Sequence, residues 1–400
     1  RTKAKIKIAT LNIRGGGSAT TRPKWDHVNQ LLRTQQIGIL AIQESHLKEE
    51  DVITLHEKFP TRLHVLNNSD PEQTAAKGVA IVINKTLLPW REAKMRVLIP
   101  GRASLLKIPW HNGEVLSVLA VYAPNDPEEN ASFWTTLRVK LEEGRLGKPD
   151  VMLGDMNVVE EASDRLPARR DAPLPVTSLG NLKDFLRLTD GWRATNGHDL
   201  SYSYTQSYTQ SRSRIDRIYV TPTILENSQN WEINLTAIKT DHKLVSMEFS
   251  HPRSPHLGKG RWAIPLHCLK NRKLMQSFRD MGLQLDREMA AIPIEESWKT
   301  GRSVQRLLCE YKAKVVKAAK EYARTAAPIL EYQIEKVKKS LRAAMNETNL
   351  TEEERKLNIC ALEEEQTRLE LLRHTKVRSQ VAARHWLEAE TVGKYWVGMN

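Results

Sequence analysis

The chain has 400 residues, of which 40% are hydrophobic and 27% are charged, and it carries a formal net charge of +13. This length suggests two domains, and no apolar run approaches the roughly 20 residues that would span a bilayer. The first residues lack the pattern of a secretory signal, and three scattered cysteines indicate neither a disulfide framework nor a zinc site. We expect an intracellular protein whose positive charge favours a polyanionic partner.

Up to about residue 250, short β-rich runs alternate with helical or polar stretches, which is typical of an α/β domain. Apolar residues at helical spacing predict helices over 25–34 and 130–143. We therefore expect residues 1–250 to form sheets covered by outer helices. The predicted strands are 6–10, 38–42, 78–83, 115–121, 151–153, 215–220 and 244–249.

A change in composition separates this domain from the rest of the chain. Residues 251–259, HPRSPHLGK, combine two prolines, a glycine and basic residues, so we place a linker at 251–260. Beyond it, apolar residues from Val304 to Val315 and from Ile334 to Met345 are spaced for single helical faces. Residues 261–400 are predicted to form a mainly α-helical tail.

Two local signals place helix boundaries in this tail. Pro328 is expected to break or restart the helix, because proline lacks a backbone N–H. Thr351 followed by Glu354 has the spacing of a capping box, which predicts the start of a long charged helix running towards Trp386.

Polar side chains stand at or just past the ends of the predicted strands. Because ligands collect at strand ends in α/β sheets, these side chains could converge on one cleft. They are Asn12 after IATL, Glu44 after ILAIQ, Tyr122 after VLAV, Asp155 and Asn157 after VMLG, Asp216 within SRIDRIY, and Asp241 and His242 in KTDHKL.

The residues that end the first strands also have structural interpretations. Asn12 and Asn157 are ordinary turn residues. Glu44 and Asp155 could cap the helices that follow them.

The later residues have such alternatives too. His242 taken alone fits a hydrogen-bonded structural histidine, and Asp216 fits a partner for Arg214 or Arg217. The combination of all these residues in one chain favours a functional site over the separate alternatives.

The order of Asn12, Glu44, GDMN at 154–157, RID at 214–216 and TDH at 240–242 resembles the exonuclease-endonuclease-phosphatase superfamily, which includes the abasic-site endonucleases. The resemblance covers residues 4–250. It implies an α/β fold, a four-layered two-sheet sandwich with outer helices, whose active site lies at one mouth.

The resemblance implies hydrolysis of a phosphodiester with Mg²⁺, for which Mn²⁺ is an alternative ion. Magnesium suits this chemistry because it takes oxygen ligands from one or two carboxylates and keeps places for water and phosphate. By resemblance, Glu44 is the principal metal ligand, Asp241 lies near or behind it, and Asn12 helps to hold the metal or the phosphate.

Catalytic roles follow from the same resemblance. Asp155 orients or deprotonates the attacking water, and Asn157 donates to the scissile phosphate. His242 donates to a phosphate oxygen, while Asp216 fixes its tautomer and favours its charged form.

Three further residues match the nuclease branch of the superfamily. Tyr122 and Asn125, in VYAPND, correspond to phosphate or metal-site contacts. Ser203 stands where that branch often has threonine, so a hydroxyl is kept.

The catalytic set alone does not choose between DNA nucleases, inositol phosphatases and sphingomyelinases. The segments IRGG at 13–16, AIQESHL at 41–47, DRLPARRD at 164–171 and SRIDRIYV at 213–220 resemble the endonuclease of LINE-type (non-LTR) retrotransposons, fungal ones in particular. Such an endonuclease nicks target DNA and leaves a 3′ hydroxyl for target-primed reverse transcription.

A polar segment near residue 205 is a candidate for DNA contact. The doubled SYTQSYTQ at 203–210 predicts a hairpin loop, and related enzymes place a hairpin against the minor groove here. Tyr208, Arg212 and Arg214 are the expected contacts, with a solvated arginine turn as the alternative.

The tail resembles the region between such an endonuclease and its reverse transcriptase, at GKGRW (258–262) and at GKYW (393–396). With no initiator Met and no aspartate pair of a polymerase, we expect a piece of a longer polyprotein that ends before that domain. The lysine cluster at 336–339 suggests contact with element RNA, with a solvated helix face as the alternative.

The expected function is therefore a magnesium-dependent DNA endonuclease that works in the nucleus. The alternatives are an abasic-site repair endonuclease, a phosphatase of the same fold acting on lipid or inositol phosphates, and an inactive DNA-binding transposon remnant. The sequence does not indicate an oligomeric state.

Overall fold

In the computed structural model, the chain forms two compact units, one of residues 1–257 with 337–375 and the other of residues 258–336 with 376–400. The expected linker at 251–260 contains the first of these divisions. The structure describes residues 2–15, 22–72, 77–111, 113–251, 253–254, 256–257, 262, 264–265, 268–291, 304–325, 329–347 and 349–389.

The first sheet is formed by strands from both ends of the predicted α/β domain. Its runs of Ile, Val, Leu and Ala explain why β3 and β5 are buried along their whole length. Strands β2 and β3 are parallel, and the other neighbours are antiparallel. In spatial order the strands are β15 (Ser228–Asn234), β16 (Leu244–Phe249), β2 (Ile6–Asn12), β3 (Ile37–Gln43), β5 (Val79–Asn84) and β4 (Leu63–Asn68).

The second sheet is built from the middle of the domain. Strands β8 and β9 are parallel, so their carboxyl ends meet at one edge, and the remaining neighbours are antiparallel. In spatial order the strands are β11 (Thr189–Asp190), β14 (Asp216–Val220), β9 (Val151–Asp155), β8 (Glu114–Tyr122), β7 (Ala103–His111) and β6 (Lys94–Ile99).

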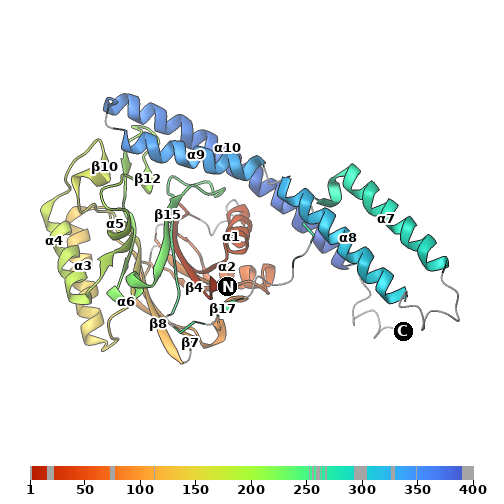
Figure 1. Ribbon diagram of the computed structural model, residues 1–400. Helices are drawn as coiled ribbons and strands as arrows, with labels where there is room; N and C mark the ends of the chain where they lie inside the picture. Colours follow the sequence, from red (N-terminus) through yellow and green to blue (C-terminus); the bar gives the residue numbers. More distant parts are fainter. Residues whose placement is uncertain are drawn as a thin grey trace. The chain divides into compact units, whose positions relative to one another are not determined.

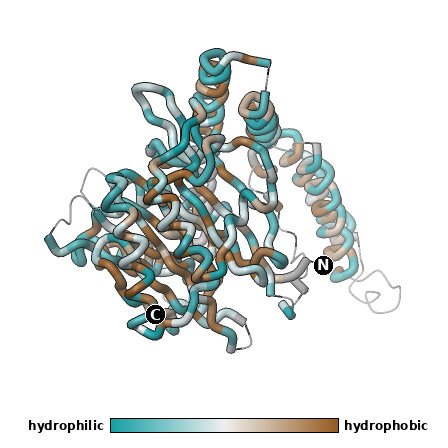
Figure 2. The backbone as a smooth tube through the Cα atoms, turned by 90° about the vertical axis from the view of Figure 1, so that its left-hand side faces the viewer, coloured by the Kyte–Doolittle hydropathy of each residue, from teal (hydrophilic) through white to brown (hydrophobic). Residues whose placement is uncertain are grey.

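The two sheets pack face to face, with a helical layer on each outer side (Figure 1). Side chains alternate along the strands: Ile8 of β2 enters the core between the sheets, whereas Leu11 faces the outer helices. Figure 2 shows these strands as hydrophobic segments inside the domain. The expected four-layered sandwich is confirmed. Helices α1 (Arg22–Thr34) and α2 (Glu49–Lys58) cover the first sheet, and α3 (Pro127–Glu143) and α4 (Pro173–Leu186) cover the second.

Smaller elements complete the first unit. Strands β10 (Arg165–Leu166), β13 (Arg212–Ser213) and β12 (Tyr204–Thr205) form a three-stranded sheet, and the segment between β12 and β13 is the hairpin turn expected from the doubled SYTQ. The others are β1 (Thr2–Lys3), β17 (His256–Leu257), α5 (Gly191–Asn196), α6 (Pro222–Glu226) and the 3-10 helices Trp90–Glu92 and Ala162–Asp164.

The C-terminal part is helical, as the composition predicted. Thr351 and Glu354 form the expected capping box: the Thr351 amide donates to Glu354 Oε2 at 3.0 Å, and the Glu354 amide donates to Thr351 Oγ1 at 3.3 Å. The elements are the 3-10 helix Cys268–Lys270, α7 (Arg272–Ala290), α8 (Val304–Thr325), α9 (Ile329–Asn346) and α10 (Glu352–Ala389).

GKYW at 393–396 and all of GKGRW except Trp262 lie outside the described residues. Helix α9 begins directly after Pro328, where a restart was expected. Among the described helices, none combines the length and apolarity needed to cross a bilayer.

Gly154 allows β8 and β9 to approach each other closely. Its φ of +149° lies in a region that side chains rarely adopt, and a Cβ atom there would lie 1.9 Å from the Val121 carbonyl oxygen. Only glycine therefore fits the position immediately before Asp155 in this parallel pair.

Asn130 links helix α3 to two loops of the second sheet. Its Nδ2 donates to the carbonyl oxygens of Pro124 and Met156, at 2.8 and 2.9 Å, and its Oδ1 accepts from Trp134 Nε1 at 2.7 Å. The side chain is 1% exposed, so water cannot replace these bonds.

We predict that Asn130→Ala lowers the free energy of unfolding by about 2 to 4 kcal/mol, because it leaves buried polar partners unsatisfied. Urea denaturation followed by circular dichroism measures this change. Ser132→Ala, on the exposed face of the same helix, is the control. Equal midpoints for Asn130→Ala and the parent protein would contradict the prediction.

Candidate active site

The predicted site residues lie at one edge of the two facing sheets. Asn12, Tyr122 and Asp155 are the last residues of β2, β8 and β9. Asp216 is the first residue of the antiparallel strand β14 and is the cross-strand partner of Asp155. The topology therefore brings together side chains that are up to about two hundred residues apart in the sequence.

Glu44 is held by donors from both sheets. Asn12 Nδ2 donates to Glu44 Oε1 at 2.9 Å, and Tyr122 Oη donates to the same oxygen at 3.1 Å. Glu44 follows β3 with a φ of +50°, an unusual value for a non-glycine residue. Helix α2 has Lys48 at its N-cap, so Glu44 does not cap it.

Asp155 is buried, with 1% of its surface exposed. Its Oδ2 accepts from Asn12 Nδ2 at 3.1 Å, and its Oδ1 accepts from the Asn157 amide at 3.1 Å. Burial raises the pKa of Asp155 to about 7, and the nearby Asp216 carboxylate adds to the increase. A carboxylate with this pKa can accept a proton near neutral pH.

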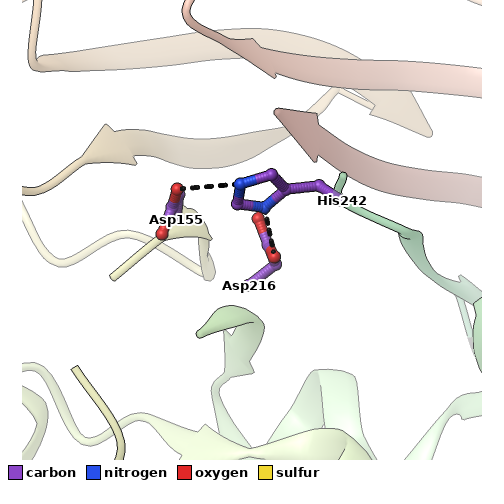
Figure 3. Close-up of side chains that lie close together, drawn as sticks. All are labelled: Asp155, Asp216 and His242. Atoms are coloured by element: carbon purple, nitrogen blue, oxygen red, sulfur yellow. Dashed lines mark hydrogen bonds and ion pairs between the residues drawn. The ribbon is translucent and has the colours of Figure 1, made fainter. Parts of the chain in front are cut away.

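His242 lies between the two buried aspartates (Figure 3). Its Nδ1 is 2.8 Å from Asp216 Oδ2, and its Nε2 is 4.0 Å from Asp155 Oδ2. Burial lowers the pKa of His242, but the carboxylates, Asp216 first, outweigh it and raise this pKa to about 9. The imidazole is therefore a cation near neutral pH.

The structure overturns the alternative partners considered for Asp216. Arg214 pairs with Asp164 and Asp190, and Arg217 donates to Glu160 and Asp164. Asp216 instead pairs with His242, and its backbone amide donates to Ser203 Oγ at 2.9 Å.

Asp241 lies at the rim of the site. Its Oδ2 accepts from Arg14 Nη1 at 3.0 Å, and the Arg14 side chain is 65% exposed. The preceding residue, Thr240, donates its hydroxyl to the Asn12 carbonyl oxygen at 2.8 Å. This bond ties the loop that carries His242 to the end of β2.

An open polar cleft of about 430 Å³ lies over these residues. Of the predicted residues, Glu44, Asn125, Asp155, Asn157, Asp241 and His242 line it. Four other predicted residues do not line the cleft but form hydrogen bonds with residues that do: Asn12, Tyr122, Asp216 and Ser203. Five further residues line the cleft and were not predicted: Arg14, Arg165, Tyr204, Ser213 and Ile215. Arg14 could have been found from its position two residues after Asn12.

The three candidate DNA contacts of the hairpin have different environments. Tyr208 is 95% exposed at the turn between β12 and β13. Arg212 and Arg214 are 1% and 2% exposed, and both are paired with carboxylates. The solvated arginine turn is therefore not observed, and the two guanidinium groups lie inside the domain instead of at its surface.

The donor atoms of the site suit a divalent cation. The carboxylate of Glu44 faces the cleft, and Asp155, Asp216 and His242 each offer an atom within 4.8 Å of the others. Asp216 is already paired with His242 Nδ1. Oxygen ligands are those that magnesium and manganese prefer, so Glu44 with Asp155 or Asp241 fits these ions better than the histidine pair does.

The chain is similar to a known protein family and to a transposon protein. Residues 9–242 match the model of the endonuclease/exonuclease/phosphatase family. The uncharacterized 149 kDa protein of transposon TX1 from Xenopus laevis is 27% identical over 317 residues, which are 78% of this chain and only 23% of that protein.

One solved structure above a TM-score of 0.5 shows the same fold. AP endonuclease LMAP from Leishmania major aligns over 62% of this chain and 88% of its own, with a TM-score of 0.54 and 14% identity. The endonuclease domain of TRAS1, a telomere-specific non-LTR retrotransposon, aligns over 62% of this chain and 99% of its own, with a TM-score of 0.45 and 15% identity.

We predict that Asp216→Asn lowers the pKa of His242 by about one to two units, because the neutral amide no longer stabilises the imidazolium. A histidine titration by NMR without added metal measures this pKa. His64, whose pKa burial holds at about 4, is an internal control. An unchanged His242 titration would show that Asp216 does not set its charge.

Proposed function

Because the chain belongs to the endonuclease/exonuclease/phosphatase family, we propose that it is a divalent-metal-dependent endonuclease that hydrolyses a phosphodiester of DNA. The observation that carries the proposal is the arrangement of Glu44, Asp155 and His242 around one open cleft. A carboxylate able to take a proton and a nearby imidazolium are what an attack of water on a phosphodiester requires.

Asp155 is proposed as the group that orients and deprotonates the water. Its Oδ2 accepts the water proton as the water oxygen attacks phosphorus and the bond from phosphorus to the 3′ oxygen breaks. The 3′ oxygen leaves as a hydroxyl after protonation by solvent, and the phosphate stays on the 5′ end. Asn157, at a φ of +50°, holds the Asp155 carboxylate through its backbone amide.

His242 is proposed to stabilise the charge that develops on the phosphate oxygens. Its Nδ1 is engaged by Asp216, so Nε2, which lies on the side of Asp155, is the proton donor to a phosphate oxygen. Glu44, with Asn12 and Asp241 nearby, is proposed to hold Mg²⁺ or Mn²⁺. The bound ion would neutralise phosphate charge and supply Lewis acidity.

DNA is the proposed substrate, and a retrotransposon of the LINE type is the proposed origin. The 27% identity to a transposon protein supports the origin, and Arg14 and Arg165 in the cleft lining support a polyanionic substrate. Tyr208, exposed at the hairpin turn, is proposed to contact the DNA. A nick with a 3′ hydroxyl would serve target-primed reverse transcription in the nucleus. The fungal source, the reverse-transcriptase linker and RNA contact by the tail stay predictions.

We predict that the protein relaxes supercoiled plasmid in Mg²⁺ or Mn²⁺ and not in chelator. Asp155→Asn should slow nicking by on the order of a thousandfold, because it removes the proton acceptor. Gel separation of nicked and supercoiled forms measures the rate. Asp184→Asn, an exposed aspartate of α4, is the matched control. Equal nicking by Asp155→Asn and the parent would refute the assignment of Asp155.

The abasic-site and phosphatase alternatives are separated by substrate. A retrotransposon nuclease is expected to cut intact duplex and abasic duplex at comparable rates, whereas a repair enzyme would prefer the lesion strongly. Matched oligonucleotides with and without one abasic site test this. Release of inorganic phosphate from inositol phosphates without plasmid nicking would favour a phosphatase, and salt-dependent DNA binding without cleavage would favour an inactive remnant.

A further inference from the structure

One carboxylate of the helical tail pairs with two buried cations of the α/β domain. Glu363, in α10, accepts from Lys243 Nζ at 2.5 Å and from Arg212 Nη2 at 3.0 Å. The Arg212 and Lys243 side chains are 0% and 4% exposed, and that of Glu363 is 12% exposed. Removing one partner of a buried pair leaves an uncompensated charge, so the domain depends on Glu363 to keep both cations in place.

Both cations stand next to residues of the candidate active site. Lys243 directly follows His242, and its backbone amide donates to the Ser203 carbonyl oxygen at 2.6 Å. Arg212 precedes Ser213, whose carbonyl oxygen accepts from the Ser203 amide at 3.0 Å. The main-chain segments that carry the two cations therefore flank Ser203 on both sides.

The Ser203 segment supports the His242–Asp216 pair directly. Ser203 Oγ accepts from the Asp216 amide at 2.9 Å, and the next residue, Tyr204, forms a β-bridge with His242. The Tyr204 and His242 rings lie 4.8 Å apart, measured between centroids. A shift of this segment would change the position of His242 relative to Asp155.

An apolar contact holds the tail on the same segment. Tyr202 and Leu166 pack with Leu341, Met345 and Ile359 of α9 and α10. Asn346 Oδ1 also accepts from the Leu200 amide at 2.8 Å. Residues 337–375 accordingly belong to the same compact unit as the α/β domain, although the sequence places them far beyond it.

We propose that Glu363 is a positioning residue for the active site: through Lys243 and Arg212 it fixes the Ser203 segment, and this segment fixes His242 and Asp216. The proposal rests on the endonuclease function proposed above. It also gives Arg212 a role inside the domain in place of the DNA contact expected from its sequence position.

The test is single-turnover nicking by the full chain at saturating plasmid. Glu363→Gln should lower the rate constant by about tenfold or more, because small displacements of reacting groups cost large factors in rate. The affinity for plasmid, measured with Ca²⁺ in place of Mg²⁺, should change much less. Glu363→Asp, which keeps the charge, should recover most of the rate. Glu353→Gln, an exposed glutamate of the same helix, should behave as the parent.

Hydrogen exchange on the same proteins separates this proposal from the proposed function. Peptides covering 200–216 and 240–246 should exchange faster in Glu363→Gln than in the parent, whether or not the parent cuts DNA. If the parent does not nick while exchange rises, the endonuclease function fails and positioning by Glu363 stands. The proposal would be overturned if Glu363→Gln nicked plasmid at the parental rate, or if Glu353→Gln lost as much of the nicking rate. Unchanged hydrogen exchange in these peptides would also overturn it.

Discussion

The site depends on two aspartates that are buried beside each other. Asp155 and Asp216 are cross-strand partners on β9 and β14, and like charges in that position repel. His242 lies between them as a cation, with Nδ1 towards one carboxylate and Nε2 towards the other. This single imidazolium offsets the charge of the two buried acids. The same arrangement leaves Asp155 able to accept a proton and His242 able to donate one, so stability and chemistry have one electrostatic origin.

A second consequence is that both sheets take part in the site. Asn12 comes from the first sheet and donates to Asp155 of the second, while Tyr122 of the second sheet donates to Glu44 of the first. The hydrophobic core between the sheets sets their separation, and these hydrogen bonds join them at one edge.

Below the site, Arg214 and Arg217 share Asp164. Burial alone would raise the pKa of Asp164, but the two guanidinium groups hold this pKa at about 2. The charge of Asp164 is thus balanced locally.

The sequence predicted the strands whose apolar residues are nearly continuous, such as β3 and β5, and the polar residues that follow them. It did not predict α4, which carries Pro173, Pro175 and Gly180, because tertiary packing overrides weak helix propensity there. It also missed β6, in which half of the side chains are exposed and only Leu98 is buried. The burial of Arg212 could not be predicted from the sequence, because its partner Glu363 lies 151 residues away. Local charge patterns do not reveal ion pairs at such a separation. A single arginine in a polar run fits a solvent-exposed position and a DNA contact equally well.

Gly154 limits how the main chain that carries Asp155 can vary. Its missing side chain lets the backbone of β9 lie against the Val121 carbonyl, so the spacing between the ends of β8 and β9 is set by bare main chain. No repacking of neighbouring side chains could make room for a larger residue there. Variation in the cleft must therefore come from the side chains and loops that line it, while the main-chain spacing of β8 and β9 stays the same.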